Sequence, residues 1–119
     1  MDSIIKDKSY KFSLRIIEVY KYLKEKKKEF ELARQILRCG TSIGANVEEA
    51  IGGQSKKDFT AKMFIAYREA RETHYWIRLL RDSEFISAKS AKSLLEDCDE
   101  LIKISGKIIS TSRKSLIKN

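Results

Sequence analysis

Proline is absent from this chain of 119 residues, and glycine occurs only five times. An all-β protein of this length would need proline and glycine at many turns, so their scarcity argues for long helices with few connections. Lys, Glu, Leu, Ile, Arg and Ala are plentiful, which suits helices. The length fits one domain, residues 1–119, that buries a core without disulfides or metal.

Cysteine is also scarce: only Cys39 and Cys98 occur, far apart and without metal-ligand spacing. This usage favours a reduced, cytoplasmic setting. The N-terminus has no apolar run like that of a signal peptide, and no segment approaches the roughly 20 apolar residues that cross a bilayer. We therefore expect a soluble cytoplasmic protein with no membrane partner.

The chain has few of the residues that catalysis or cofactor binding usually requires. His74 is the single histidine, so a nucleophilic cysteine would have one possible base and nothing to orient it. No glycine-rich loop follows a strand, and Gly52-Gly53 is typical of a helix stop rather than a phosphate cradle. We expect no enzyme activity, no metal and no cofactor.

Positive charge is in excess, with a formal net charge of +8. The excess is spread over residues 1–29, 55–83 and 84–119 and spares residues 30–54. A basic protein attracts phosphate polyanions through a long-range, salt-sensitive field. The alternative is that lysine-rich helices are simply solvated, and composition does not decide between the two.

Apolar spacing predicts four helices. They cover residues 3 or 6 to 26, 29–51, 55–82 with Ser55 as the cap, and 87 to 109 or a little beyond with Ser87 as the cap. The polar residues 110–115 are expected to fray. Short links between long helices imply antiparallel neighbours, so the predicted fold is all-α, an up-down-up-down four-helix bundle.

Two glycines interrupt the second predicted helix, Gly40 and Gly44. Each costs about 1 kcal/mol relative to alanine inside a helix. We expect a continuous helix in which a neighbouring helix approaches closely over these small residues. The alternative is a break near residues 39–42, with Ser42 capping a new helix.

The third predicted helix carries an unbroken four-three apolar seam from Phe59 to Leu80, as in a bundle or coiled coil. Large apolar residues also lie outside this seam, and the interface prediction rests on Phe64, Tyr67, Trp76 and Leu79. In a chain this short, a second apolar surface indicates another subunit. The alternative is that these side chains lie half-buried at the edges of the stripe.

A basic stripe follows one side of the same helix. Its members are Lys57, Arg68, Arg71, Tyr75 and Arg78. Arginine forks pair with phosphates, and aromatic rings stack on unpaired bases. The alternative is ion pairing within the helix, to Glu72 and Asp82 four residues after two of the arginines.

Residues 34–86 carry two specific segments, SIGANVEE at 42–49 and EARETHYW at 69–76. Through them the chain resembles the bacterial 23S rRNA intervening-sequence proteins, which are similar to the accessory proteins of diversity-generating retroelements. The resemblance covers nearly the whole chain. It implies a four-helix bundle, a cyclic homo-oligomer that is typically a pentamer, a basic surface that contacts nucleic acid in some members, and no catalysis. Where the family usually has Glu-Gly, this chain has Glu49-Ala50, a departure that affects only the end of the second helix.

Three polar residues match positions that recur in the family's motifs: Asn46, Glu49 and Glu72. We expect a buried hydrogen-bond network that fixes helix register. A di-metal bundle site would instead need a Glu-x-x-His pair on each of two helices. His74 stands two residues after Glu72 and five after Glu69, which does not fit that pattern.

Together these observations predict a non-enzymatic, oligomeric nucleic-acid-binding module that contacts structured RNA through a basic surface. The alternative is a homo-oligomeric scaffold or accessory protein that recruits a protein partner and does not bind nucleic acid directly.

Overall fold

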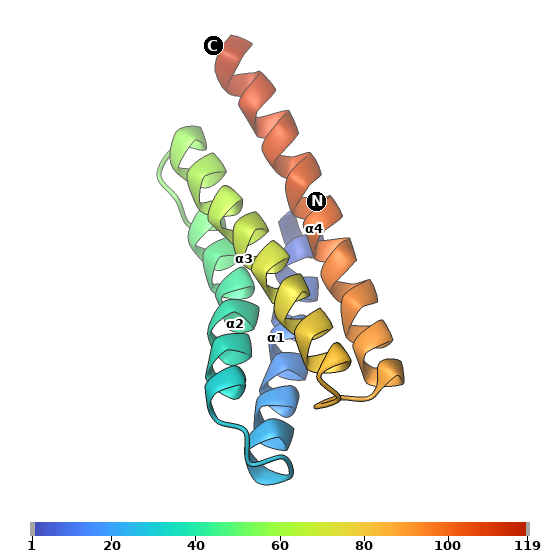
Figure 1. The fold of residues 1–119 in the computed structure, drawn as a ribbon. Coiled ribbons are helices and arrows are strands. Elements are labelled where there is room, and N and C mark those ends of the chain that lie inside the picture. Colours follow the sequence, from blue (N-terminus) through green and yellow to red (C-terminus); the bar gives the residue numbers. More distant parts are fainter. Residues whose placement is uncertain (1, 119) are drawn as a thin grey trace.

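Four helices make up almost all of the chain in the computed structural model, which describes residues 2–118. They are α1 (Asp2–Glu25), α2 (Glu31–Ile51), α3 (Lys56–Asp82) and α4 (Ala88–Lys118). Each helix runs antiparallel to the next, and the bundle measures 52 × 21 × 20 Å (Figure 1). The predicted all-α four-helix bundle is confirmed.

α1 and α2 approach closely because two glycines of α2 face α1. A Cβ atom on Gly40 would stand 2.7 Å from two side-chain carbons of Ile16, and one on Gly44 would stand 3.3 Å from the backbone oxygen of Ser9. A larger side chain would push the helices apart or displace these atoms. α2 runs unbroken past Ser42, as the continuous-helix prediction has it.

Serine side chains cap α3 and α4 where the sequence predicts. Ser55 Oγ accepts a hydrogen bond from the backbone N–H of Asp58 (3.0 Å), and Ser87 Oγ accepts one from Ser90 (3.1 Å). Each serine satisfies a backbone N–H group that the first helical turn leaves without a partner. The Glu29 carboxylate does the same for α2, whose first turn begins two residues later than predicted.

The core follows the predicted apolar seams. Its largest fully buried side chains come from all four helices and include Phe12, Ile36, Met63, Ile77 and Leu101. Full burial of such a side chain contributes about 1.5–3 kcal/mol. α1 has less contact with α4 than with α2, so the seam between the first and last helices is the loosest of the four.

The last turns of α4 differ from the prediction. Residues 110–115 were expected to fray, but α4 continues to Lys118. Ser112 is 8% exposed, and its hydroxyl hydrogen-bonds that of Thr60 on α3. The four-three seam therefore continues past residue 109, with small hydroxyl side chains in place of large apolar ones. The polarity of residues 110–115 alone does not predict where the helix ends.

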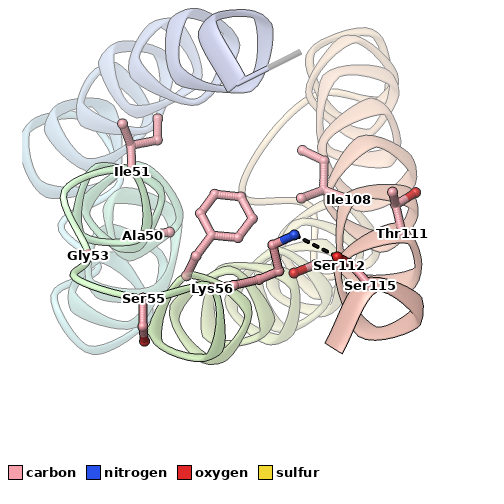
Figure 2. Close-up of a pocket in the computed structure, with 10 residues that line it drawn as sticks. Ala50, Ile51, Gly53, Ser55, Lys56, Ile108, Thr111, Ser112 and Ser115 are labelled. Atoms are coloured by element: carbon pink, nitrogen blue, oxygen red, sulfur yellow. Dashed lines mark hydrogen bonds between the residues drawn. The ribbon is translucent and has the colours of Figure 1, made fainter. Parts of the chain in front are cut away.

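A groove of about 550 Å³ opens at this end of the bundle, where α4 runs past the N-terminal end of α1 (Figure 1). Figure 2 shows it between the end of α2, the start of α3 and the last turns of α4. Ile51, Phe59 and Ile108 give it apolar walls. Lys56 donates across it to Ser115 Oγ at 2.6 Å and so ties α3 to α4 (Figure 2).

Candidate nucleic-acid interface

The eight arginines of the chain divide into two groups by their partners. Four lie within ion-pairing distance of a carboxylate: Arg15, Arg34, Arg38 and Arg81. The other four have no such partner among residues 4–117, whose side chains the structure describes: Arg68, Arg71, Arg78 and Arg113. Three of these belong to α3 and one to the end of α4, so the arginines without a matching carboxylate gather on the α3–α4 side.

The predicted basic stripe is exposed along α3. Lys57, Arg68 and Arg71 all point into solvent. Arg71 Nη1 donates to the Tyr67 hydroxyl at 3.5 Å, and its guanidinium stands 5.9 Å from the centre of that ring. This contact orients the guanidinium without neutralising it, so the charge is available to an outside anion.

The alternative of ion pairing within α3 is wrong for the two pairs that the sequence suggested. Glu72, the expected partner of Arg68, binds Arg38 of α2 instead. It also accepts a hydrogen bond from the indole nitrogen of Trp76 at 3.0 Å. Sequence spacing shows which side chains of one helix can contact each other. It does not show that Arg38 of the neighbouring helix competes for Glu72.

At the end of α3, Asp82 is likewise taken by a neighbour. Arg81 Nε donates to it at 2.7 Å, and this hydrogen bond holds the pKa of the Asp82 carboxyl below its ordinary value. Arg78 Nε donates to His74 Nδ1 at 3.1 Å, and His74 Nε2 lies 3.1 Å from Asp99 Oδ1 on α4. His74 therefore links α3 to α4 and positions Arg78.

Tyr75 completes the predicted binding set on the outer face of α3. Its side chain is 49% exposed, the Arg78 guanidinium stands 5.8 Å from its ring centre, and its ring meets Trp76 nearly edge-on at 5.6 Å. Lys57 lies eleven residues before Arg68, which is about three helical turns along the same side. The structure thus brings all five predicted binding residues to one exposed helix face.

A groove between α3 and α4 adds residues that the sequence reasoning missed. We call it the α3–α4 groove; it encloses about 380 Å³ beside Phe64 and Tyr67. Arg113 stands 5.0 Å from the centre of the Phe64 ring. This arginine was overlooked because it falls in the segment expected to fray, although the four-three spacing through Ser112 was a signal that the helix continues.

The four predicted interface residues do not form one patch. Phe64 and Tyr67 line the α3–α4 groove, while Trp76 binds Glu72 on the side that faces α2. Leu79, three residues after Trp76, lies on that same side. All four are half-buried within the single chain. Their contact with another subunit stays a prediction.

A family model described as 23S rRNA-intervening sequence protein matches residues 1–107. The chain belongs to this family. It is also similar to a solved structure, described as a protein with unknown function from the S23 ribosomal protein family of Bacteroides thetaiotaomicron. The two sequences are 46% identical, the TM-score is 0.90, and the match covers 92% of this chain and 97% of the other. A comparison with curated proteins found no match.

The buried network expected from the motifs of the 23S rRNA-intervening sequence family is not formed. Asn46 donates to the backbone oxygen and the hydroxyl of Ser42 in its own helix, at 2.9 and 3.0 Å. Glu49 is exposed, and Glu72 binds residues other than these two. The family motifs did not bring the three side chains together, because Glu49 lies eleven residues, or about 16 Å, along α2 from Arg38, which binds Glu72.

The ionic cluster that α2 and α3 do share centres on Glu69. Arg38 bridges Glu69 and Glu72, with its Nη1 3.6 Å from Glu69 Oε2. That oxygen is buried without a hydrogen bond among the described residues. Burial, and next the charge of Glu72, raise the pKa of the Glu69 carboxyl above its ordinary value.

The two thiols are poor nucleophiles in this fold. Burial raises the pKa of Cys39 to about 11 and that of Cys98 to about 12. Cys98 Sγ donates to the Ala70 carbonyl oxygen at 3.2 Å. Because the thiolate is the reactive form, both groups are held in their unreactive state near neutral pH.

Within the described part of the chain, no group of three or more histidine, cysteine, aspartate or glutamate side chains is arranged to hold a metal ion. None of the helices described is long and apolar enough to cross a membrane.

Proposed function

We propose that this member of the 23S rRNA-intervening sequence family is a non-enzymatic, homo-oligomeric module that binds structured RNA through the outer face of α3. One observation carries the proposal: the arginines that lack a carboxylate partner gather on the α3–α4 side, and Lys57 extends their line. The family description names 23S rRNA, which makes RNA the first polyanion to test.

The binding would be driven mainly by phosphates. A guanidinium fork pairs with two phosphate oxygens, and each neutralised phosphate releases condensed counterions. Phosphate contacts fix position but carry no base sequence. We therefore expect recognition of RNA shape, with steep salt dependence and weak sequence preference.

The direct test compares two double charge reversals with the same change in net charge. Arg71→Glu with Arg78→Glu removes two members of the stripe, while Lys21→Glu with Lys24→Glu changes one exposed and one half-buried cation of α1. Fluorescence anisotropy with two unrelated RNA hairpins measures the affinity of each variant. The proposal expects the α3 variant to lose most of its affinity for both hairpins and the α1 variant to lose much less.

Two results would contradict this assignment. If the α1 variant loses more affinity than the α3 variant, the RNA lies on the first helix. If the α3 variant no longer assembles, as light scattering would reveal, the arginines belong to an interface between copies.

The oligomeric part of the proposal is a cyclic homo-oligomer, with a pentamer as the expected number. It is supported by large apolar side chains on the side of α1 that faces away from the core: Ile4 is 50% exposed, Tyr10 63% and Leu14 50%. Apolar residues gathered in this way are typical of a surface that another chain covers. Trp76 and Leu79 are further candidates for such contacts.

Light scattering tests the assembly. A monodisperse mass near that of the 13.8 kDa chain at micromolar concentration would contradict it. Leu14→Glu should lower the mass, whereas Lys11→Glu, which adds negative charge to an exposed neighbouring residue without removing apolar surface, should change it less.

The alternative function is a scaffold that recruits a protein and does not touch nucleic acid. The same exposed apolar side of α1 favours it, because a different protein would cover that surface equally well. Assembly without any RNA affinity would support this alternative.

A further inference from the structure

The α3–α4 groove combines an aromatic floor with a basic rim. The Phe64 and Tyr67 rings are nearly parallel, at 20° to each other with their centres 6.2 Å apart, and both line the groove. Arg113 and Lys114 of α4 stand on the rim. None of the described residues that line the groove carries a carboxylate.

The arginines beside the groove keep their hydrogen-bond donors available. Arg71 has one contact with a polar side chain among the described residues, the Tyr67 hydroxyl at 3.5 Å, which is long for a hydrogen bond. Arg113 lies over the Phe64 ring at 5.0 Å and pairs with no carboxylate in the described part of the chain. A planar group already rests against this aromatic floor, so the groove accepts flat partners.

The Tyr67 ring lies against α4 at Gly106. A Cβ atom on Gly106 would be in van der Waals contact with Tyr67 Cε1, at 3.4 Å. The ring is therefore held between two helices rather than free to rotate away. A fixed ring is a better stacking surface than a mobile one, because less conformational entropy is lost when a partner stacks on it.

We propose that the α3–α4 groove holds one unpaired base of an RNA loop. The inference rests on the proposed RNA-binding function and deepens it. The base replaces the Arg113 guanidinium on the Phe64 ring and packs beside Tyr67. The displaced Arg113, together with Arg71 and Lys114, then contacts the phosphates on either side. The basic rim without a carboxylate selects a polyanion, and the aromatic floor selects one that exposes the face of a base. A paired helix hides those faces, whereas a loop presents them.

The groove lies beside Arg71 of the stripe but is completed by residues near the end of α4. Arg113, Lys114 and Ile117 lie beyond residues 1–107, the part that the family model matches. A chain could therefore keep the phosphate-binding stripe of α3 and lack this base site, which makes the two separable by experiment.

The test uses two labelled RNAs with the same stem, one closed by an unpaired loop and one a plain duplex. Tyr67→Leu keeps an apolar side chain but removes the aromatic face. Loss of one stacked base weakens binding by about tenfold, so we expect that loss for the loop RNA and no change for the duplex. Tyr22→Leu is the matched control, because Tyr22 is a 43% exposed tyrosine with Lys27 near its ring, but it lies on α1.

A second measurement leaves the fold of the protein untouched. RNA carrying 4-thiouridine in the loop is crosslinked to the wild-type chain by light, and the attached peptide is identified by mass spectrometry. We expect crosslinks in the segment that contains Phe64 and Tyr67. Phe64→Leu should reduce their yield.

The outcomes separate the two proposals. If the wild-type chain binds neither RNA, the proposed function fails and the base site with it. If it binds both and Tyr67→Leu weakens neither, or weakens both equally, the base site is refuted while RNA binding stands. If Tyr67→Leu instead lowers the mass of the assembly, the groove is an interface between copies, and the base site is again refuted.

Discussion

Replacing Gly40 with alanine should destabilise the protein, although alanine is the better helix former. The helix preference alone would stabilise α2 by about 1 kcal/mol. Against it, the new Cβ atom would stand 2.7 Å from two carbons of Ile16 and 3.0 Å from a third, and that side chain is fully buried. Overpacking of this kind costs about 1–3 kcal/mol. With the whole Ile16 side chain affected, we expect the upper part of that range and a net loss of about 1–2 kcal/mol.

The same substitution at Gly106 is the matched comparison and should act in the opposite direction. There the new Cβ atom would meet only Tyr67 Cε1, at 3.4 Å. The half-buried tyrosine can move by the small amount needed, so most of the gain of about 1 kcal/mol from helix preference should remain.

Urea unfolding, followed by circular dichroism at one fixed protein concentration, measures both variants. The concentration is held constant because assembly adds to apparent stability. Ile16→Ala should remove most of the penalty of Gly40→Ala, so the double variant should be more stable than the sum of the single effects predicts. If both alanine variants are stabilised alike, α1 stands farther from α2 than described and the reasoning is refuted.

Four further outcomes are expected. Ser112→Ala should lower the free energy of unfolding by about 1 kcal/mol, because it breaks a buried hydroxyl pair. Ser110→Ala, an exposed change on the same turn, should have no effect in the same urea assay. Equal effects of the two variants would mean that the last turns of α4 are frayed. The fold raises the thiol pKa values of Cys39 and Cys98 from 9.0 to about 11 and about 12. Their contribution to stability is therefore complete below pH 9 and is lost as the pH rises toward these values, so Cys98→Ala should flatten the alkaline decline in urea midpoint. Chelators should leave the melting temperature unchanged, and a large drop would indicate a metal site. Trp76→Ala should lower the mass of the assembly in light scattering, and an unchanged mass would remove this indole from the interface.

The fold was predictable because its signals are local. Each signal depends on residues a few positions apart: the apolar seam of α3, the serine caps, and the helix stop at Gly52-Gly53. Spacing along the sequence was therefore enough to locate them. The end of α4 was not predictable in the same way. Ser112 is typical of a loop by sequence, and its burial depends on a hydrogen bond to Thr60 of another helix.

The candidate site was predictable only in part. Helical spacing placed the five predicted binding residues on one face of α3, since that face depends on one helix alone. It did not reveal that Arg38 would bind Glu72, or that Phe64 and Tyr67 would line a groove beside α4. Such pairings depend on which helices become neighbours and at what register, and a single sequence does not state this.

The salt dependence of RNA affinity tests the central claim most directly. Anisotropy titrations of one hairpin between roughly 50 and 200 mM salt give the slope of log affinity against log salt. A range of roughly this width is enough to resolve several phosphate contacts. Wild type should show a steep slope, and Arg71→Glu with Arg78→Glu should reduce its magnitude by about two, or about one for each lost phosphate contact. A wild-type slope near zero, or an equal slope in the double variant, would contradict phosphate binding by the outer face of α3.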